Sequence, residues 1–263
     1  MDFESLVQSI TGADGIIGVL MIIVLALIAL VTLFSAGVSI YLAIKYVKFN
    51  RRKNSRGMTG VEVARKILDD NGLQNIKVKT VGSMLFGNSY SHYFKKVRLR
   101  RMTRNKTSVT AMAMGSQKAA LAVLDKEGDP DMQKRVKLVP LITFGPFAFI
   151  PLIIVGVIID LLLFNASGVC TVIFSAVGVL FFVFSLVLSV MTLKTEIKAQ
   201  NRAYELLKQG DLATDEEIEM MKELFKLYNI QYVNDIILAA LELIYRILQI
   251  AAKFSNNSNS SNN

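Results

Sequence analysis

The sequence contains one cysteine, Cys170, and one histidine, His92. A single cysteine excludes an intramolecular disulfide, so sulfur chemistry gives no indication of the compartment. A single histidine severely limits any metal centre built from imidazole ligands. The chain also has no glycine-rich phosphate loop and no Gly-x-Ser-x-Gly turn, so it lacks the sequence patterns of a P-loop enzyme or a serine hydrolase.

Charge is absent from three long stretches of the chain. The 263 residues are 52% hydrophobic, which is too apolar for an ordinary soluble domain of this size. The uncharged runs are 30, 22 and 33 residues long, and about 20 helical residues cross a bilayer. The first run is too long for the core of a cleaved signal, and acidic residues precede it. We therefore predict membrane spans at 16–44, 138–160 and 169–193.

Basic residues are confined to one side of these spans. None precedes the first span, and none lies in the turn at 161–168. Residues 47–138 carry 21 Lys and Arg against 7 Asp and Glu, a net charge of 21 − 7 = +14. Because Lys and Arg are retained on the cytoplasmic side, we predict a multi-pass protein of the cell membrane. Its amino terminus is expected outside, and its basic region and carboxyl terminus in the cytoplasm. The expected juxtamembrane anchors are Arg51, Arg52 and Lys53.

The basic region between the first two spans has signals for helices and strands. A capping-box pattern opens a helix over 59–71, and Asn-Gly ends it. Alternating residues predict strands at 76–80 and 96–100, and the charged face of the second suits a sheet edge. Residues 82–92 are expected to form a loop. An Ala- and Met-rich stretch predicts a helix over 107–126.

The carboxyl-terminal part is also expected to be helical. A helix over 195–208 continues the third span, and a second capping box starts a helix that runs from 214 to about 228. Four polar residues of 231–253 fall on one helical face, which favours a helix lying on the bundle or the membrane surface over a fourth span.

The predicted fold is an α-helical membrane protein with three transmembrane helices, a small α+β cytoplasmic domain and a carboxyl-terminal amphipathic helix. Its segments are an outer amino terminus (1–15), a first span (16–44), a basic cytoplasmic region (45–137), two further spans (138–160 and 169–193), cytoplasmic helices (194–229), an amphipathic membrane-associated helix (230–254) and a disordered tail (255–263).

The stretch 57–73 resembles a known family. Its order, Gly-Met-Thr-Gly-Val-Glu-Val-Ala-Arg-Lys-Ile-Leu-Asp-Asp-Asn-Gly-Leu, is similar to the opening signature of the YugP-type membrane zinc metallopeptidases, which are neutral zinc metallopeptidases. His92-Tyr93 and Val97-Arg98-Leu99 continue the likeness. In that family a helix with His-Glu-x-x-His, two spans and a Glu-x-x-Ala helix follow, and the chain shows this order of elements over about 50–250. The resemblance implies a metallopeptidase-like helical core.

The zinc motif of that family is degenerate in this chain. Two histidines four residues apart share one helical face and can bind one zinc ion, and the glutamate between them serves as general base. Aligning the flanking Ala and Leu positions places Gly115 and Ala119 at the histidines and Ser116 at the glutamate. Gly and Ala have no metal-binding side chain, and Ser cannot act as that base. We therefore expect no catalytic residue and no cofactor, with zinc only if another metal arrangement exists.

The third-ligand helix of the family has a counterpart in Thr195-Glu196-Ile197-Lys198-Ala199. The resemblance assigns Glu196 to the zinc-binding glutamate, as the remnant of the site. The alternative is a glutamate stabilised by the helix dipole near Thr195.

Other single residues have a functional and a structural interpretation. His92 is either a lone metal ligand or pH sensor, or a loop histidine hydrogen-bonded to backbone, and we favour the second. Asp160 ends the second span, where an interfacial anchor is favoured over a functional intramembrane acid. Cys170 lies inside a span and is expected to be inert.

A basic cluster lies close to the expected inner leaflet. It lacks the interleaved aromatic residues of a nucleic-acid platform, so nucleic acid is not an expected partner. Anionic lipid head groups attract juxtamembrane cations and are the favoured ligand, ahead of a solvated surface or an acidic protein. The cluster comprises Lys95, Lys96, Arg98, Arg100, Arg101, Arg104 and Lys106.

These observations favour a non-catalytic relative of zinc metallopeptidases, a pseudoenzyme that acts as a scaffold or adaptor. It is expected to keep a peptidase-like cavity between the helices at 107–126 and 195–209, where a peptide or partner binds without being cut. Two alternatives remain: an active peptidase with an atypical metal site, and a subunit of a homo-oligomeric membrane assembly or pore.

Overall fold

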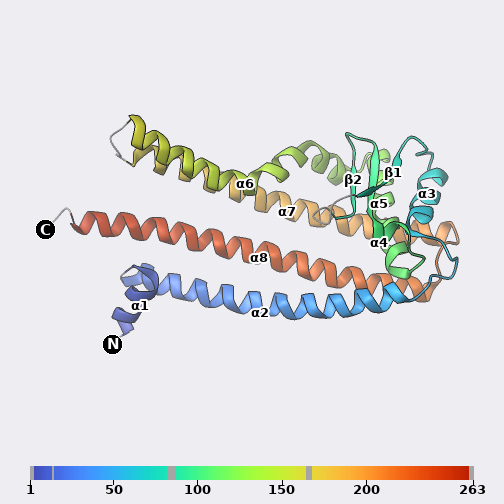
Figure 1. Cartoon of the computed structure of the whole chain (residues 1–263), viewed down its shortest axis with the longest axis horizontal. Helices are drawn as coiled ribbons and strands as arrows, with labels where there is room; N and C mark the ends of the chain where they lie inside the picture. Colours follow the sequence, from blue (N-terminus) through green and yellow to red (C-terminus); the bar gives the residue numbers. More distant parts are fainter. Residues whose placement is uncertain (1–2, 14, 82–86, 164–167, 261–263) are drawn as a thin grey trace. The chain divides into compact units, whose positions relative to one another are not determined.

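The structure is a computed structural model of the whole chain. It describes residues 3–13, 15–81, 87–163 and 168–260, and it describes the side chains of these residues except at 3, 139–150 and 253–260. The chain divides into two compact units, each built from three segments. Unit 1 comprises 1–37, 141–187 and 231–263; unit 2 comprises 38–140 and 188–230, so that four long helices contribute to both. Most of the helices and strands are labelled in Figure 1.

A three-stranded sheet forms one part of unit 2. The central strand β3 pairs in parallel with β1 and antiparallel with β2. The sequence-based expectation that β3 lies at a sheet edge is therefore wrong. Alternating charge indicates which face of a strand is solvated, and both edge and central strands have such a face. The strand β2 falls in the region expected to be a loop. The strands are β1 (Lys77–Val81), β2 (Ser89–Ser91) and β3 (Lys96–Arg100).

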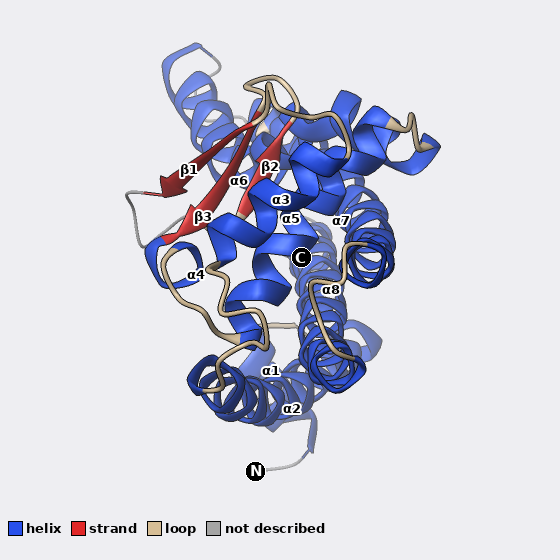
Figure 2. Ribbon diagram, turned by 90° about the vertical axis from the view of Figure 1, so that its right-hand side faces the viewer, coloured by secondary structure: helices blue, strands red, loops and turns tan. Residues whose placement is uncertain are grey.

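Helices cover the face of the sheet that carries Val97 and Leu99, both fully buried. The helices α3 and α5 contact each other as well as the sheet (Figure 2). The predicted capping box at the start of α3 is confirmed, since Thr59 and Glu62 exchange both hydrogen bonds. Ser108 caps α5 by accepting a hydrogen bond from the Ala111 amide. The helices are α3 (Gly60–Asp70), α4 (Arg101–Arg104) and α5 (Val109–Lys126).

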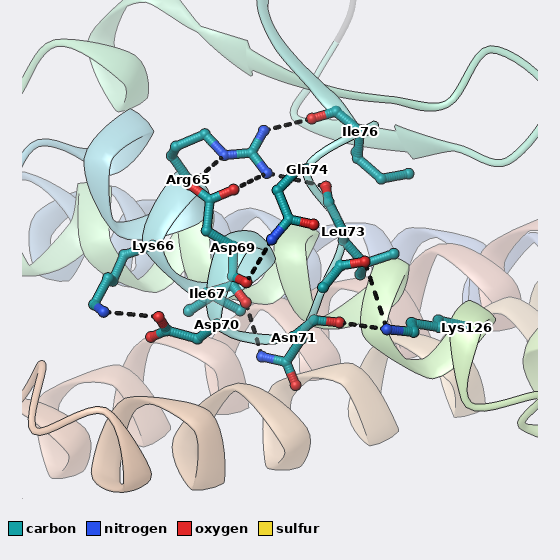
Figure 3. A network of polar contacts seen from close by, with 11 residues as sticks. Arg65, Lys66, Ile67, Asp69, Asp70, Asn71, Leu73, Gln74, Ile76 and Lys126 are labelled. Carbon is teal, nitrogen blue, oxygen red and sulfur yellow. Dashed lines mark hydrogen bonds and ion pairs between the residues drawn. The ribbon is translucent and has the colours of Figure 1, made fainter.

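The carboxyl-terminal end of α3 is fixed by a polar network (Figure 3). Arg65 bonds the Asp69 carboxylate and donates to the carbonyls of Leu73 and Ile76. Lys126, at the end of α5, donates to the carbonyl of Asn71 at 2.6 Å. Arg65 of the family-like stretch 57–73 and Lys126 of α5 thus satisfy free carbonyls in the turn from α3 into β1.

Parts of the long helices complete the core of unit 2. Fully buried residues from α5, α7 and α8, such as Leu121, Leu207 and Phe225, pack in one cluster with Leu99. The expected helical continuation from 169–193 into 195–208 is confirmed, because α7 is uninterrupted. The long helices are α2 (Gly15–Arg51), α6 (Pro130–Leu163), α7 (Val169–Gln209) and α8 (Asp215–Ser260).

The helix α8 begins at a second reciprocal cap. Thr214 and Glu217 exchange hydrogen bonds, and the Glu217 carboxylate also accepts from the amide and hydroxyl of Ser55. The helix then continues for 46 residues. The expected boundary near 229 is absent, and residues 255–260, expected to be disordered, are helical. Residues 261–263 of that tail lie outside the described residues.

Unit 1 contains the apolar parts of the long helices and a short unpredicted helix, α1 (Phe3–Thr11). Two helices, α2 and α7, are long and apolar enough to cross a membrane, and only 17% of each apolar window is buried. The predicted second span cannot be assessed in full, because the side chains of 139–150 lie outside the described residues. Its described apolar part, Pro151–Leu163, is shorter than a span.

The second half of α8 runs antiparallel to α2 within unit 1. Gln231 donates a hydrogen bond of 2.8 Å to the hydroxyl of Ser35. At the other end of the contact, Ala252 packs with Met21 and Ala13. The two helices therefore lie side by side over most of the first predicted span.

Candidate functional site on helices α5 and α7

The carboxylate of Glu196 lies at the centre of a charged cluster in unit 2. Its Oε2 accepts from the Lys118 ammonium at 2.7 Å and from the Gln117 amide at 2.9 Å. Its Oε1 accepts from the Arg135 guanidinium at 2.8 Å. Two donors from α5 and one from α6 thus meet a single carboxylate on α7.

The cluster is largely withdrawn from solvent. The side chains of Lys118, Arg135 and Glu196 are 10%, 18% and 17% exposed. Burial by itself opposes ionisation of Glu196, but the two adjacent cations outweigh it and lower the pKa of the carboxyl to about 2. The carboxylate is therefore ionised and neutralised by the protein's own side chains near neutral pH.

A second group of ion pairs extends the cluster along α7. Lys198 contacts the carboxylates of both Asp129 and Asp131, and Lys194 lies 3.2 Å from Asp131. Hydrogen bonds from Lys198 and Lys194 lower the pKa of Asp131. These contacts hold the start of α6 against α7, beside the Glu196 cluster.

The three positions assigned by the sequence to the degenerate motif lie elsewhere on α5. A Cβ atom on Gly115 would lie 2.4 Å from the carbonyl oxygen of Gly60, so this position faces α3 at a close backbone crossing. The Ser116 hydroxyl donates to the carbonyl of Ala113, within its own helix. Ala119 is fully buried.

Sequence reasoning missed Gln117, Lys118 and Arg135, although it identified Glu196. One signal was present, because Lys118 is the only charged residue from 107 to 124. A lysine in the middle of an otherwise apolar helix needs a counter-charge when it is buried. Glu196 provides it. Because α7 runs uninterrupted from Val169 to Gln209, Glu196 is far from a helix start, and the helix-dipole interpretation is wrong.

The residues around Glu196 do not fit a zinc ion. Zinc sites in proteins are built from Cys, His, Asp and Glu side chains, whereas the neighbours of Glu196 are an ammonium, a guanidinium and an amide. Neither cation can donate a lone pair to a metal, and both would repel one. Among the described residues no three Cys, His, Asp or Glu side chains are grouped as a metal site.

His92 belongs to a different site, at the junction of β2 and α5. Its Nδ1 lies 2.6 Å from Oδ2 of Asp125, and the Tyr90 hydroxyl donates to the same oxygen. Burial and the Asp125 charge raise the pKa of Tyr90. These side chains line a pocket of about 340 Å³ with Lys95 and Gln133. The favoured expectation of a histidine bonded to backbone is therefore wrong; its partner is a buried carboxylate.

The remaining predicted residues have separate positions. Asp160, in unit 1, accepts from the amides of Cys170 and Thr171, so it caps α7. This contact is consistent with an anchoring role for Asp160. It also involves the backbone amide of Cys170, the residue whose side chain was expected to be inert. Arg52 forms a salt bridge with Glu216, and the backbone of Lys53 forms an isolated antiparallel β-bridge with Ser108.

The expected basic cluster is distributed over β3, α4 and the segments beside them in unit 2, where Lys95 precedes β3 and Lys106 follows α4. Lys96 and Arg98 lie on the face of β3 opposite the core, whereas Arg101 and Arg104 belong to α4. Arg104 donates to the Thr80 hydroxyl of β1. Arg51 and Lys48 border an open groove of about 590 Å³ on α2, with Ala43, Ile44 and Val47.

Comparison with known proteins identifies the same family over most of the chain. A family model described as "Putative neutral zinc metallopeptidase" matches residues 21–251. A relative named "Putative membrane protease YugP", from Bacillus subtilis (strain 168), is 26% identical over 229 residues, which are 86% of this chain and 95% of the relative. No solved structure matches.

Proposed function

The chain belongs to the neutral zinc metallopeptidase family, and we propose that it is a non-catalytic membrane member in which internal cations have replaced the catalytic metal. The single observation that carries this proposal is the contact of Glu196 with Lys118 and Arg135. Glu196 is the residue that the resemblance assigns to the metal, and the site's positive charge now comes from the protein.

The structure favours a different frame for the degenerate motif. If Glu196 marks the former metal position, the motif must be the part of α5 that reaches it, and Gln117 and Lys118 do so. The frame then runs from 117 to 121, with Gln117 and Leu121 at the histidines and Lys118 at the glutamate. The earlier assignment relied on flanking Ala and Leu residues, which recur too often in this helix to fix an alignment.

This frame leaves no group for the chemistry of a metallopeptidase. A glutamine and a leucine replace the metal ligands, and an ammonium takes the place of the general base. The Lys118 ammonium, which donates a hydrogen bond to Glu196, has no free lone pair, so it cannot remove a proton from water. Both the 115–119 and the 117–121 frames therefore lead to the same proposed loss of activity.

The ion cluster supports a scaffold role for unit 2. Glu196 joins α5, α6 and α7, and removing its carboxylate would leave the largely buried Lys118 and Arg135 without this counter-charge. Direct hydrogen bonds from Gln117 and Lys118 to Glu196 join the two helices between which the cavity was expected, 107–126 and 195–209. We propose that the fixed helix arrangement itself presents a surface to a peptide or protein partner, rather than a cleft that opens and closes around a substrate.

Zinc binding tests the proposal directly. The full chain, purified in detergent and stripped with a chelator, is expected to retain well under one zinc per molecule after zinc is added and the excess removed, measured by elemental analysis. Casein cleavage should be the same for the wild-type chain and for Glu196→Ala. One zinc per chain that is lost in Glu196→Ala would overturn the proposal.

A rebuilt motif tests the frame. Gln117→His, Lys118→Glu and Leu121→His, combined with Arg135→Leu, should restore zinc binding because they place two imidazoles beside Glu196. The matched control carries Gly115→His, Ser116→Glu and Ala119→His with the same Arg135→Leu change. It should bind no zinc and fold poorly, since any Cβ at 115 collides with Gly60. Zinc binding by the control alone would refute the 117–121 frame.

A further inference from the structure

On the outer face of the sheet in unit 2, two of the three residue pairs between β1 and β3 consist of cations, and the third pairs Val81 with Arg100. The parallel register places Lys77 beside Lys96 and Lys79 beside Arg98. Because β3 buries Val97 and Leu99 toward the helices, these four side chains point away from the core. Like charges directly opposite each other destabilise a sheet, so this arrangement costs stability unless an anion covers it.

The sequence supplies no nearby acid to offset these charges. No Asp or Glu occurs from 71 to 124, whereas this stretch contains ten Lys and Arg. Burial and the neighbouring charges of Arg98 and Lys79 lower the pKa of Lys96. Within the part of the chain that the structure describes, no ion pair involves Lys77, Lys79, Lys96 or Arg98. The face is therefore suited to an external anionic ligand.

Exposed aromatic rings stand next to these cations. The turn between β2 and β3 exposes 60% of Tyr93 and 66% of Phe94. The Lys96 ammonium lies 4.2 Å from the centroid of the Phe94 ring, and the Arg98 guanidinium lies 5.9 Å from it. An exposed apolar ring among cations is typical of surfaces that contact the interface of a bilayer, where rings and cations find suitable surroundings together.

The turn also lies close to the start of a predicted span. The Tyr93 hydroxyl donates to the backbone carbonyl of Val136, in α6, at 3.1 Å. The apolar run of the second predicted span starts at residue 138. The turn is thus fixed beside the part of α6 that is expected to approach the membrane surface, and this position favours a lipid over a soluble partner.

We propose that the outer sheet face and the Phe94 turn form a docking site for anionic phospholipids. The Phe94 ring enters the head-group region, and Lys77, Lys79, Lys96 and Arg98 bind the lipid phosphates and carboxylates. The site holds unit 2 against the bilayer, and it does not depend on whether the Glu196 cluster is catalytic.

A tryptophan reporter can test this docking, because the chain contains no tryptophan. Phe94→Trp in the full chain would be reconstituted into vesicles that contain brominated phosphatidylcholine, with or without phosphatidylserine. We expect acyl-chain bromines to quench the emission when phosphatidylserine is present, and high salt to weaken the quenching. Each cation removed should lower the docked-to-undocked ratio about fivefold, so that Lys79→Gln, Lys96→Gln and Arg98→Gln together lower it about a hundredfold.

Matched variants separate a lipid site from a general charge effect. Lys66→Gln, Lys208→Gln and Lys222→Gln remove the same charge from exposed ion pairs on α3, α7 and α8 and should leave the quenching unchanged. Tyr204→Trp, packed against Phe225 in the core, should show no dependence on lipid charge. Quenching that is equal with and without phosphatidylserine would overturn the proposal. So would a reporter that is quenched in neither vesicle but protected by an added acidic protein.

Discussion

At the residue scale, Glu196, which the family resemblance assigns to the metal site, lies in a largely buried ion cluster. Its charged neighbours on α5 and α6 are cations with no free lone pair. The cluster depends on the carboxylate, because it is the counter-charge of both cations. Stability should therefore depend strongly on the ionisation of Glu196.

Replacing Glu196 by glutamine should lower the free energy of unfolding by about 3 kcal/mol near pH 7. The folded pKa is about 2, below the reference value of 4.5. The ionised carboxylate thus contributes its full stability above pH 4.5, and this contribution is lost as the pH falls toward 2. The difference between wild type and Glu196→Gln should shrink over that range in denaturant unfolding of the full chain in detergent.

The control for this substitution is Glu205→Gln. Glu205 pairs with Arg202 on the same helix, but its side chain is 58% exposed, so the cost should be below about 1 kcal/mol at every pH. An equal loss for Glu196→Gln at pH 7 and pH 3 would show that the carboxylate's charge is not what stabilises the cluster.

At the element scale, the ends of helices were easier to predict than their partners. The capping patterns at 59–62 and 214–217 are local and form as expected, because the side chains that satisfy a helix start lie within four residues. The cap of α8 has an additional partner that the sequence does not indicate. Glu217 also binds Ser55, 162 residues away, and so ties the end of α2 to the start of α8.

Glu217→Ala should therefore affect two separate segments. Burial opposes the ionisation of Glu217, but hydrogen bonds from Thr214 and Ser55 lower its pKa on balance. Removing the carboxylate leaves the amides of Ser55 and Thr214 without this acceptor, at a cost of about 2 kcal/mol. Hydrogen exchange should accelerate at both amides.

Two neighbouring substitutions serve as comparisons for Glu217→Ala. Thr214→Ala should cost about 1 kcal/mol and affect the helix start alone. Glu219→Ala removes an exposed partner of Lys222 and should change neither amide. Unchanged exchange at Ser55 in Glu217→Ala would contradict a link between the two segments.

At the scale of the whole molecule, the continuity of α8 changes the expected topology. Its second half lies along α2 from Gln231, at Ser35, to Ala252, near Met21. A helix that lies beside α2 over this length would occupy the same depth as the first predicted span. The polar residues Asp235 and Glu242 disfavoured this placement in the sequence, but intramembrane acids do occur where protein or water surrounds them.

We therefore expect α8 to cross the membrane and the carboxyl terminus to lie on the same side as the amino terminus, contrary to the orientation inferred from the sequence. The test uses a Cys170→Ser background with single cysteines introduced by Ser9→Cys, Asn75→Cys and Asn263→Cys. A maleimide that cannot cross membranes should label the first and third in intact cells, and Asn75→Cys only after permeabilisation. Asn263→Cys labelling only after permeabilisation would restore the cytoplasmic carboxyl terminus.

The sequence alone determined what depends on composition and on residues close together in the chain. Apolar runs, helix caps and the strand at 96–100 result from local hydrophobicity and hydrogen bonding, so they could be predicted. The sequence also showed that the family's histidines are missing, since no imidazole occurs after 92. Only the tertiary structure decided that Lys118 and Arg135 meet Glu196, that β3 is central and that α8 lies along α2. Each is a contact between residues distant in the chain, and the packing of buried surfaces, rather than local preference, selects among such contacts.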